Sequence, residues 1–320
     1  MVTMLSREEL LNKYGQKAWI SPYARIICMV DRQRKLIELH EFHARGTCIG
    51  GSAWEIYHYP RVSKLVLRAR REGARNIFIM SEGICDLKLK ASIAGAGVEK
   101  IENKGSRTFV TYAGLAGGGI AATVCRGMAE GVIGVRIYKT GGGSQLGRAT
   151  LVLPALSKVI IGVDDTDEAG AGATWGLVNE ISHALASQSY GFYLNHAIVQ
   201  FYTKNPHKTT NCVGLAVTFA VPRGREKRLI DAFKERVKRN TFSKHTGMVA
   251  FRGIIPPKEV IEFGKRAKTE LLTAEEAIKL ADKNHIETYV ITGERGLIGA
   301  LAAIGFANDP DEAVKIWENI

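Results

Sequence analysis

The sequence has no uninterrupted apolar run of about eighteen residues, the length a membrane-spanning helix needs. Its longest candidate, residues 149–163, is broken by Pro154 and Lys158. The first residues, MVTMLSREELLNKYG, carry charges where a secretory signal needs its apolar region. We therefore expect no membrane partner and a cytoplasmic location.

Cysteine is also scarce, and no CxxC pair occurs. The five cysteines are scattered along the chain: Cys28, Cys48, Cys85, Cys125 and Cys212. An odd number without paired spacing argues against both a disulfide framework and a zinc ribbon. His40 and His43 lie near Cys48, but three residues apart on an expected strand they would point to opposite faces, which disfavours a metal site.

Acidic residues are few in the N-terminal half. Residues 1–157 contain 23 basic and 12 acidic residues, whereas residues 158–320 contain 21 and 20, so nearly all of the net charge of +12 belongs to the first half. This excess suits a polyanionic partner such as RNA, a nucleotide-like cofactor or an acidic protein. It equally suits a role in solubility alone.

A length of 320 residues with 46% apolar residues allows two domains, each with its own core. We place the boundary at residues 154–158, where the charge balance changes, and expect a basic domain at 1–155 and a second domain at 156–320. Strand and helix patterns alternate in both. The expected fold is therefore α/β (α+β), with two domains of short mixed β-sheet and helices packed on one face.

The most informative stretch is IGVDDTDEAGAGATWG, residues 161–176. A run of β-branched residues predicts a buried strand that ends in three carboxylates, and a glycine turn and a helix follow. The residues concerned are Asp164, Asp165, Asp167, Gly170, Gly172 and, as a possible N-cap, Thr174. Crowded carboxylates are easier to keep ionised around a cation such as Mg²⁺, and the turn amides suit phosphate. The alternative is that the aspartates only form Asx-turns and cap the helix.

Two further segments could hold phosphate. The stretch KNPHKTTN, residues 204–211, offers two ammonium groups and hydroxyls on one loop, with Lys204, Lys208 and Thr209 as candidates. Near the end of the chain, Arg295 and Gly296 stand between a short strand and a helix of small residues. The alternative for Gly296 is a glycine that only allows close packing of the helix on the sheet.

Two glycine patterns in the first half are weaker. Gly117, Gly119 and Ala122 have dinucleotide-loop spacing, but the next strand ends at Lys139 where a ribose-binding acid is needed, so close packing or phosphate contact is favoured. Residues 141–148 have Walker-like glycines without the lysine, which favours a glycine hairpin.

Three ordered segments resemble the archaeal isoleucine-tRNA 2-agmatinylcytidine synthetases. IGVDDTD is similar to their GIDDTD strand, NPHKTTNCV at 205–213 to their NPxxPWKTRGN loop, and GERGLIGALAAIG at 293–305 to their RGxxGALAAIG turn and helix. The likeness covers about residues 158–307. The chain as a whole looks like methanogenesis marker protein 11, an archaeal family.

The resemblance implies a kinase-like and ferredoxin-like architecture, ATP as a cofactor, and phosphorylation of a threonine that corresponds to Thr174. Lys208 and Thr209 match the family, whereas Thr210, Asn211 and Cys212 replace its Arg, Gly and Asn. The synthetases join agmatine to a tRNA cytidine and grip tRNA with further domains, including a zinc ribbon. The lack of a CxxC pair leaves the acceptor of this chain open.

These observations predict an ATP- and Mg²⁺-dependent phosphoryl- or nucleotidyl-transfer enzyme. Asp164, Asp165 and Asp167 are its expected metal ligands or acceptor-activating groups. Lys208 and Arg295 are expected to neutralise phosphate charge. The acceptor would be RNA, held by the basic half, or a protein or cofactor of methanogenesis. The alternative is a non-catalytic RNA-binding or assembly factor that keeps the fold.

Overall fold

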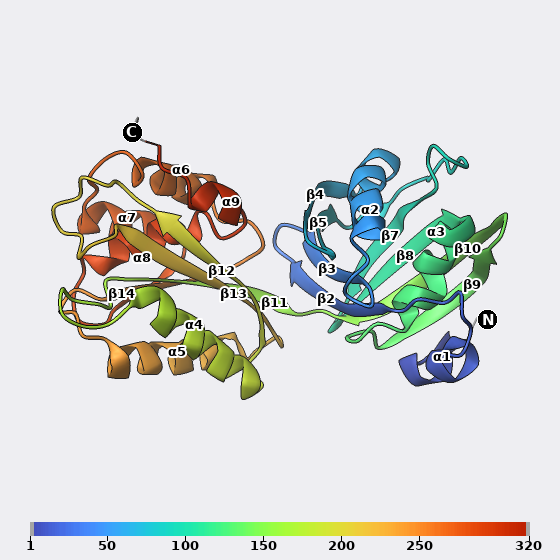
Figure 1. Cartoon of the computed structure of the whole chain (residues 1–320), viewed down its shortest axis with the longest axis horizontal. Coiled ribbons are helices and arrows are strands. Elements are labelled where there is room, and N and C mark those ends of the chain that lie inside the picture. Colours follow the sequence, from blue (N-terminus) through green and yellow to red (C-terminus); the bar gives the residue numbers. More distant parts are fainter. Residues whose placement is uncertain (1–2, 318–320) are drawn as a thin grey trace. The chain divides into compact units, whose positions relative to one another are not determined.

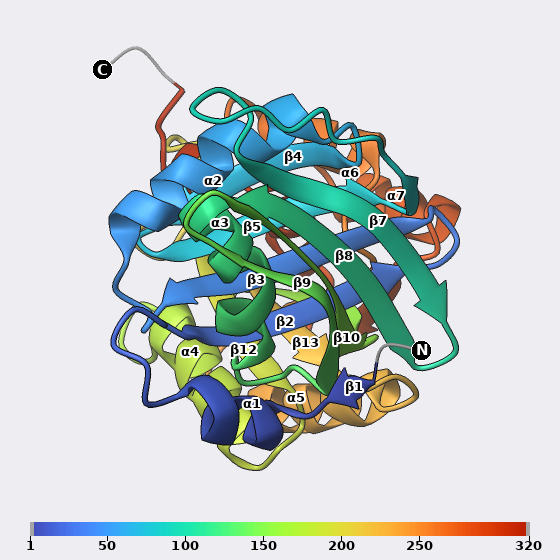
Figure 2. The ribbon, with the colours of Figure 1, turned by 90° about the vertical axis from the view of Figure 1, so that its right-hand side faces the viewer.

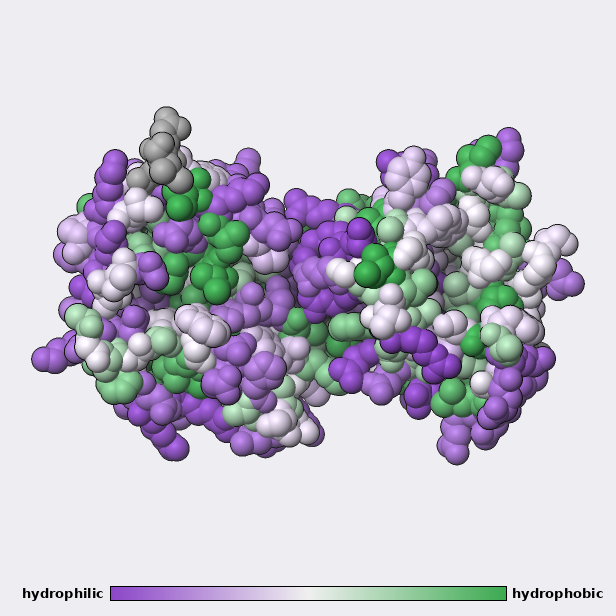
Figure 3. Space-filling model, viewed as in Figure 1, coloured by the Kyte–Doolittle hydropathy of each residue, from purple (hydrophilic) through white to green (hydrophobic). Residues whose placement is uncertain are grey.

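The computed structural model describes residues 3–317, which divide into two compact units with their boundary between Leu156 and Ser157. Each unit has its own hydrophobic core. In Figure 3 hydrophilic residues cover most of the visible face of each unit, and apolar residues form smaller separate groups. Among the described residues no helix combines the length and apolar character that a membrane crossing requires.

The first unit contains two antiparallel sheets. One has the strand order β2 (Tyr23–Asp31), β3 (Leu36–Ala44), β5 (Arg75–Ser81) and β4 (Val66–Glu72). The other runs β1 (Met4–Leu5), β9 (Gly134–Gly142), β10 (Gln145–Pro154), β8 (Arg107–Leu115), β7 (Ala96–Lys104) and β6 (Gly83–Ile84). Short turns close the hairpins: Gly73, Gly105 and Gly143 have positive φ in the turns of β4–β5, β7–β8 and β9–β10, and Lys35, with φ of 52°, ends the turn of β2–β3.

Helices of the first unit pack on these sheets. Helix α2 (Ile49–Val62) lies against β4 and β7, and α3 (Ala116–Ile120) continues into the π-helical segment Ala121–Cys125 beside β8, β9 and β10 (Figure 2). The N-terminal helix α1 (Arg7–Tyr14) starts with a capping box in which Ser6 and Glu9 bond each other's backbone, as its sequence spacing predicts.

The second unit is one five-stranded antiparallel sheet covered on both faces. Its strand order is β12 (Phe192–Gln200), β13 (Val213–Val221), β11 (Ser157–Asp164), β14 (Gly247–Arg252) and β15 (Glu287–Val290). Helices α4 (Thr174–Ser187) and α5 (Glu226–Asn240) cover one face. Helices α6 (Lys258–Arg266), α7 (Ala274–Lys283) and α8 (Gly296–Ile304) cover the other, and α9 (Pro310–Ala313) follows (Figure 1).

Strand β11 lies in the middle of this sheet because its side chains are apolar on both faces. Val159, Ile161 and Val163 point to the α4–α5 side, and Ile160 packs on the α8 side. A side chain at Gly162 would lie 2.0 Å from the Ala300 carbonyl oxygen, so α8 approaches the strand backbone directly. The strand end, where the carboxylates stand, is thereby held beside the first turns of α8.

The α/β class is confirmed, but four details of the sequence interpretation are wrong. Pairing between the named strands is antiparallel and not mixed, and the second unit has helices on both faces. Helix α4 starts at Thr174, with Ala173 and not Thr174 as its N-cap.

The fourth error concerns residues 256–272, whose sequence pattern predicts a helix throughout. Helix α6 ends at Arg266 because Lys268 turns inward, where its ammonium donates to the carbonyls of Gln200, Ala313 and Lys315 at 3.0, 2.7 and 2.9 Å. The chain then leaves the helix axis. Residues 270–272 become available to line a cavity on this side of the sheet.

Candidate functional site

The site begins where β11 ends. Asp165 adopts a left-handed backbone conformation with φ of 57°, which aspartate tolerates better than most residues. Its N–H donates to Asp164 Oδ1 at 2.8 Å, and its carbonyl accepts from the Thr246 hydroxyl at 2.6 Å. This local turn separates the two adjacent carboxylates and sends them in different directions.

Asp164 is packed against the start of α8. A Cβ added to Gly299 would lie 1.7 Å from Asp164 Oδ2, so only glycine leaves room for this carboxylate. Burial, and then the nearby Asp165 carboxylate, raise the pKa of Asp164 well above its ordinary value of 3.8. The Asp164 carboxyl group therefore loses its proton less readily than that of an ordinary aspartate, unless a cation lies nearby.

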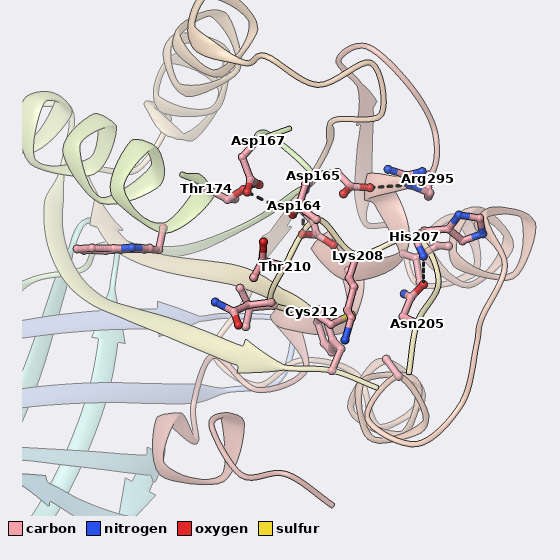
Figure 4. Close-up of a pocket in the computed structure, with 18 of the residues that line it drawn as sticks. Asp164, Asp165, Asp167, Thr174, Asn205, His207, Lys208, Thr210, Cys212 and Arg295 are labelled. Atoms are coloured by element: carbon pink, nitrogen blue, oxygen red, sulfur yellow. Dashed lines mark hydrogen bonds and ion pairs between the residues drawn. The ribbon is translucent and has the colours of Figure 1, made fainter. Parts of the chain in front are cut away.

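Asp165 faces Arg295 from the turn before α8. Arg295 Nε donates to Asp165 Oδ2 at 2.9 Å, and both side chains are partly shielded from water (Figure 4). This bond uses one of the five N–H donors of the guanidinium. Arg295 therefore balances a site carboxylate while keeping donors for another anion.

Asp167 lies between two hydroxyl groups. It accepts from Thr174 Oγ1 at 2.7 Å through Oδ1, and from Thr209 Oγ1 at 3.3 Å through Oδ2. Thr174 Oγ1 accepts in turn from the backbone N–H of Thr166 at 3.3 Å. The predicted N-cap threonine therefore serves the carboxylate and the turn backbone, and not the end of its own helix.

The loop between β12 and β13 brings its lysine and hydroxyls to the same place. The Lys208 ammonium donates to the Thr203 carbonyl, which uses one of its three donors. The His207 N–H donates to Asn205 Oδ1 at 2.9 Å, which shapes the turn before Lys208. Figure 4 shows Thr210 below Asp164, and Lys208 beside it with its ammonium turned away from the aspartates.

These groups line one cavity of about 370 Å³ within the second unit. Of the candidates from the sequence, it brings together Asp164, Asp165, Asp167, Gly172, Thr174, Lys208, Thr209 and Arg295. Gly170, Lys204 and Gly296 do not line it. Gly296 has a packing position instead, since a Cβ there would lie 2.4 Å from the Gly247 nitrogen and 2.8 Å from the Asp164 carbonyl oxygen.

The sequence interpretation did not anticipate the rest of the wall. Apolar and aromatic lining comes from Trp175, Phe201, Leu271, Leu272 and Ile298, and Glu270 adds a carboxylate. Trp175 is 57% exposed. A tryptophan side chain is usually largely buried, so this exposure indicates a surface that a ligand could cover. The other wall residues come from distant segments and carry no local signal.

Cys212 stands where the synthetase motif has Asn. It lines the cavity, and burial, together with the Asp164 carboxylate, raises its pKa to about 11. The thiol is therefore neutral near pH 7 and contributes shape to the cavity without charge.

The carboxylates fit a shared cation better than a closed metal site. Among the described residues no group of three or more His, Cys, Asp or Glu side chains is arranged to hold a metal by itself. Mg²⁺ in nucleotide sites is usually held by one or two carboxylates together with phosphate oxygens and water. The raised pKa of Asp164 is what a cation would relieve, so the donor set fits Mg²⁺ that arrives with a nucleotide.

The weaker patterns of the first unit are structural. Residues 141–148 form the expected hairpin between β9 and β10. Gly119 is closely packed, since an added Cβ would lie 2.7 Å from the Gly114 carbonyl oxygen and 2.8 Å from the Gly147 nitrogen. His40 contacts Glu38 at 2.8 Å, whereas His43 lies 3.5 Å from Glu55, so the two imidazoles take different partners.

Comparison with known proteins gives one close relative. The chain is 42% identical over 298 residues to the uncharacterized protein MJ0921 of Methanocaldococcus jannaschii, a match that spans 93% of this chain and 98% of that protein. The membership in methanogenesis marker protein 11 that the sequence suggested stays a prediction, because this relative has no assigned role.

Residues 160–230 match the family model described as the TiaS TCKD domain, which confirms the resemblance to the agmatinylcytidine synthetases over that part. Two similar solved structures are a complex of TiaS with tRNA and ATP, at 23% identity and a TM-score of 0.42, and a tRNA fluorescent labeling enzyme, at 23% identity and 0.41. The likeness covers 47% and 46% of this chain and 36% of each of those chains.

Proposed function

We propose that this chain, which belongs to the same family as the uncharacterized protein MJ0921 of Methanocaldococcus jannaschii, is an ATP- and Mg²⁺-dependent enzyme of phosphoryl or nucleotidyl transfer. One observation carries the proposal. Three strand-end carboxylates, a lysine, an arginine and a buried threonine from three separate segments line a single cavity of about 370 Å³. The match of residues 160–230 to the TiaS TCKD domain supports it.

Asp164 and Asp165 are the residues that would hold Mg²⁺. When bound, Mg²⁺ neutralises phosphate charge and orients the phosphates for transfer. The Asp165 N–H donates to Asp164 Oδ1, and the missing side chain of Gly299 leaves room for Asp164 Oδ2. The position of the carboxylate is therefore set before any ligand enters. A carboxylate that is already in position needs no reorganisation free energy during the reaction.

Lys208 and Arg295 would hold the phosphates. They come from the β12–β13 loop and from the turn before α8, and both line the cavity of the aspartates (Figure 4). Phosphoryl transfer depends mainly on positioning and on neutralising negative charge, and cationic side chains with spare donors supply both. The apolar wall, which includes Trp175 and Leu272, would contact the base or ribose of the nucleotide.

Thr174 and Asp167 form a nucleophile and base pair. The threonine hydroxyl donates to Asp167 Oδ1 at 2.7 Å, within the range needed to pass its proton. In the proposed step, Thr174 Oγ1 forms a bond to the γ-phosphorus of ATP, the bond to the β-phosphate oxygen breaks, and Asp167 receives the hydroxyl proton. Phosphothreonine at 174 and ADP are the products.

The favoured final acceptor is RNA. The N-terminal half carries a net charge of +11 from 23 basic and 12 acidic residues, and an excess of this size suits a polyanion. A gel-shift with bulk tRNA at increasing salt tests this, because binding through phosphate contacts weakens steeply as salt rises. Absence of salt-sensitive binding would favour a protein or cofactor of methanogenesis as the acceptor.

Product analysis tests the enzymatic activity. Purified protein with Mg-ATP is expected to release ADP or AMP, and Asp165→Asn is expected to abolish that release. Asp231→Asn is a matched control, because Asp231 is an exposed residue of α5 that pairs with Lys227 and does not line the cavity. Equal turnover in both variants would overturn the assignment of the site.

A non-catalytic RNA-binding or assembly factor is the second candidate. The ion pair of Asp165 with Arg295 favours it, because these two charges already balance each other without a ligand. Titration calorimetry separates the two. An enzyme binds ATP in the presence of Mg²⁺, whereas a factor that kept only the fold binds RNA and gives no heat with ATP.

A further inference from the structure

The first unit contains a second cavity, of about 620 Å³. Every lining residue lies between Trp19 and Gly143, so the cavity is built from the first unit alone. One wall comes from the segment before β2 and the end of β3: Trp19, Ser21, Tyr23, His43, Ala44 and Arg45. The opposite wall comes from the α3 and π-helical turns and from the β9–β10 hairpin, including Ile120, Cys125, Gly142 and Gly143.

The hairpin wall is held rigidly in place. A Cβ added to Gly141 would lie 2.7 Å from the Gly119 carbonyl carbon, and one added to Gly147 would lie 2.3 Å from the Gly119 carbonyl oxygen. Backbone therefore packs directly on backbone between the hairpin and α3. Gly142 and Gly143 follow, with φ of 102° and 55°. Because glycine has no side chain, these two residues present only backbone atoms to the cavity.

The floor of the cavity, formed by Tyr23 and His43, contacts a buried cluster of charged side chains. Arg126 is fully buried and donates through Nη2 to Glu41 at 2.9 Å and to Glu55 at 2.8 Å. Glu55 also accepts from the Tyr23 hydroxyl and lies 3.5 Å from His43 Nε2. A buried ion pair is usually no better for stability than apolar packing. Its effect here is to fix the rings of Tyr23 and His43, both of which line the cavity.

His43 contributes packing to this floor. It is 7% exposed, and its Nδ1 is covered by protein atoms. The ring packs against helix α2, because a Cβ added to Gly51 would lie 2.2 Å from His43 Cε1 and 2.9 Å from Nδ1. The Tyr23 ring lies beside it, with the two ring centres 4.5 Å apart. The two rings therefore form a closely packed floor.

Charge and shape define the ligand further. Arg45 is the only Lys or Arg among the described residues that line the cavity, and no Asp or Glu lines it. At the rim Trp19 is 61% exposed, with the Lys17 ammonium 5.4 Å from its ring centre. An exposed tryptophan next to cations suits a ligand that combines a flat neutral ring with a separate negatively charged group.

From these features we propose that this cavity binds a nucleotide, with its base on Trp19 and its phosphate near Arg45. A base offers a flat face for the tryptophan, and glycine backbone lets a ribose approach closely. The nucleotide is either a free ribonucleoside monophosphate or one residue of an RNA chain. This site shares no lining residue with the aspartate cavity and does not depend on ATP turnover there.

Calorimetry with the full chain and the four ribonucleoside 5′-monophosphates tests the proposal, with the matching nucleosides and a ten-nucleotide mixed RNA as further probes. At least one monophosphate is expected to bind once per chain and more tightly than its nucleoside. Trp19→Ala is expected to weaken binding about tenfold or more, as the loss of base stacking does. Arg45→Ala is expected to weaken the monophosphate but not the nucleoside.

Two controls keep the outcomes distinct. Trp54→Ala removes an exposed tryptophan of α2 outside the cavity, and Lys279→Ala removes an exposed lysine of α7 that lines neither cavity, so both are expected to bind the monophosphate like the unaltered chain. Tighter binding of the RNA than of any monophosphate assigns the site to an RNA residue, and the reverse assigns it to a free nucleotide. No binding of any probe, or full binding by Trp19→Ala, overturns the proposal.

Discussion

The Thr174 hydroxyl donates a 2.7 Å hydrogen bond to Asp167 Oδ1, across a glycine turn that links a strand end to a helix start. Both groups line the aspartate cavity, and Thr174 is only 6% exposed. A threonine at the first position of a helix normally faces solvent or caps the backbone. Here its oxygen is held by Thr166 and aimed at a carboxylate, which is the arrangement of an acceptor hydroxyl with its base.

Thr174→Val is therefore expected to abolish phosphate incorporation, because valine keeps the shape of threonine and removes the oxygen. The change also leaves Asp167 without this donor and should cost about 1–3 kcal/mol of folding free energy. Incubation with γ-labelled ATP, followed by mass spectrometry of the peptide that contains residue 174, measures incorporation.

Thr174→Ser is the matched control, since it keeps the hydroxyl and should retain labelling. Urea unfolding of both variants separates loss of chemistry from loss of fold. Label on the valine variant at the level of the unaltered chain would show that another residue accepts the phosphate.

Local sequence patterns predicted the parts of this site that lie on one segment. The strand, the acidic turn and the following helix of residues 159–187 are continuous in sequence, and their apolar periodicity is strong. The N-cap was predicted one residue late, at Thr174 instead of Ala173. The capping preference of threonine does not reveal that its hydroxyl bonds to Asp167 instead.

The parts that depend on distant segments could not be predicted in the same way. Arg295 pairs with Asp165 across 130 positions of sequence, and only the antiparallel order of β11, β14 and β15 brings them together. The place of Arg295 between a strand end and a helix start made it a phosphate candidate, and the family resemblance agreed, but neither predicted its pairing with Asp165. Leu271 and Leu272 were read as helix, because nothing local reveals that Lys268 is drawn inward by carbonyls 45 and 68 positions away.

Lys268 gives a second prediction, which concerns stability. Burial lowers the pKa of Lys268 to about 8 from its ordinary 10.5. Because the folded-state pKa is depressed, the stability linked to this group is fully present above pH 10.5 and is lost as pH falls through about 8. The unaltered chain should gain stability between these values, relative to Lys268→Met, which cannot titrate there.

Urea unfolding of the two proteins from pH 7.5 to 10.5 measures the difference. Lys279→Met serves as control, because Lys279 is an exposed residue of α7 paired with Glu275 and should leave the pH slope unchanged. An identical slope in Lys268→Met would show that the buried ammonium is not the source.

Asp164 gives a third prediction, with the opposite dependence on pH. Its folded-state pKa is raised above the ordinary 3.8, so its stabilising contribution is fully present below pH 3.8 and is lost as pH rises through the folded-state value. Asp164→Asn, which stays neutral, should therefore become increasingly more stable than the unaltered chain as pH rises from 4 toward 8. Chemical unfolding in the presence of EDTA measures this trend.

Addition of Mg²⁺ with a non-hydrolysable ATP analogue should reverse that order at high pH, because a cation offsets the charge of Asp164 and binding stabilises the folded state. The amide of Asp164→Asn cannot respond in this way. A stability difference that is independent of both pH and Mg²⁺ would remove Asp164 from the proposed metal site.

Gly299 gives the last prediction, because it is the residue that leaves space for Asp164. A Cβ at position 299 would lie 1.7 Å from Asp164 Oδ2 and 2.6 Å from its Cγ, so Gly299→Ala must push the carboxylate away from α8. We expect turnover of Mg-ATP to fall about tenfold or more, as small displacements of catalytic groups commonly cause. The fold should survive, since alanine favours a helix by about 0.5–1 kcal/mol over glycine and offsets part of the strain.

Gly176→Ala is the matched control for this change. Gly176 is also a helical glycine of the second unit, but a Cβ there would meet nothing within 4 Å, so alanine should raise stability without moving a site residue. Turnover and urea unfolding are measured for both variants. If Gly299→Ala turns over ATP as fast as Gly176→Ala, the position of the Asp164 carboxylate against α8 is not needed for the reaction.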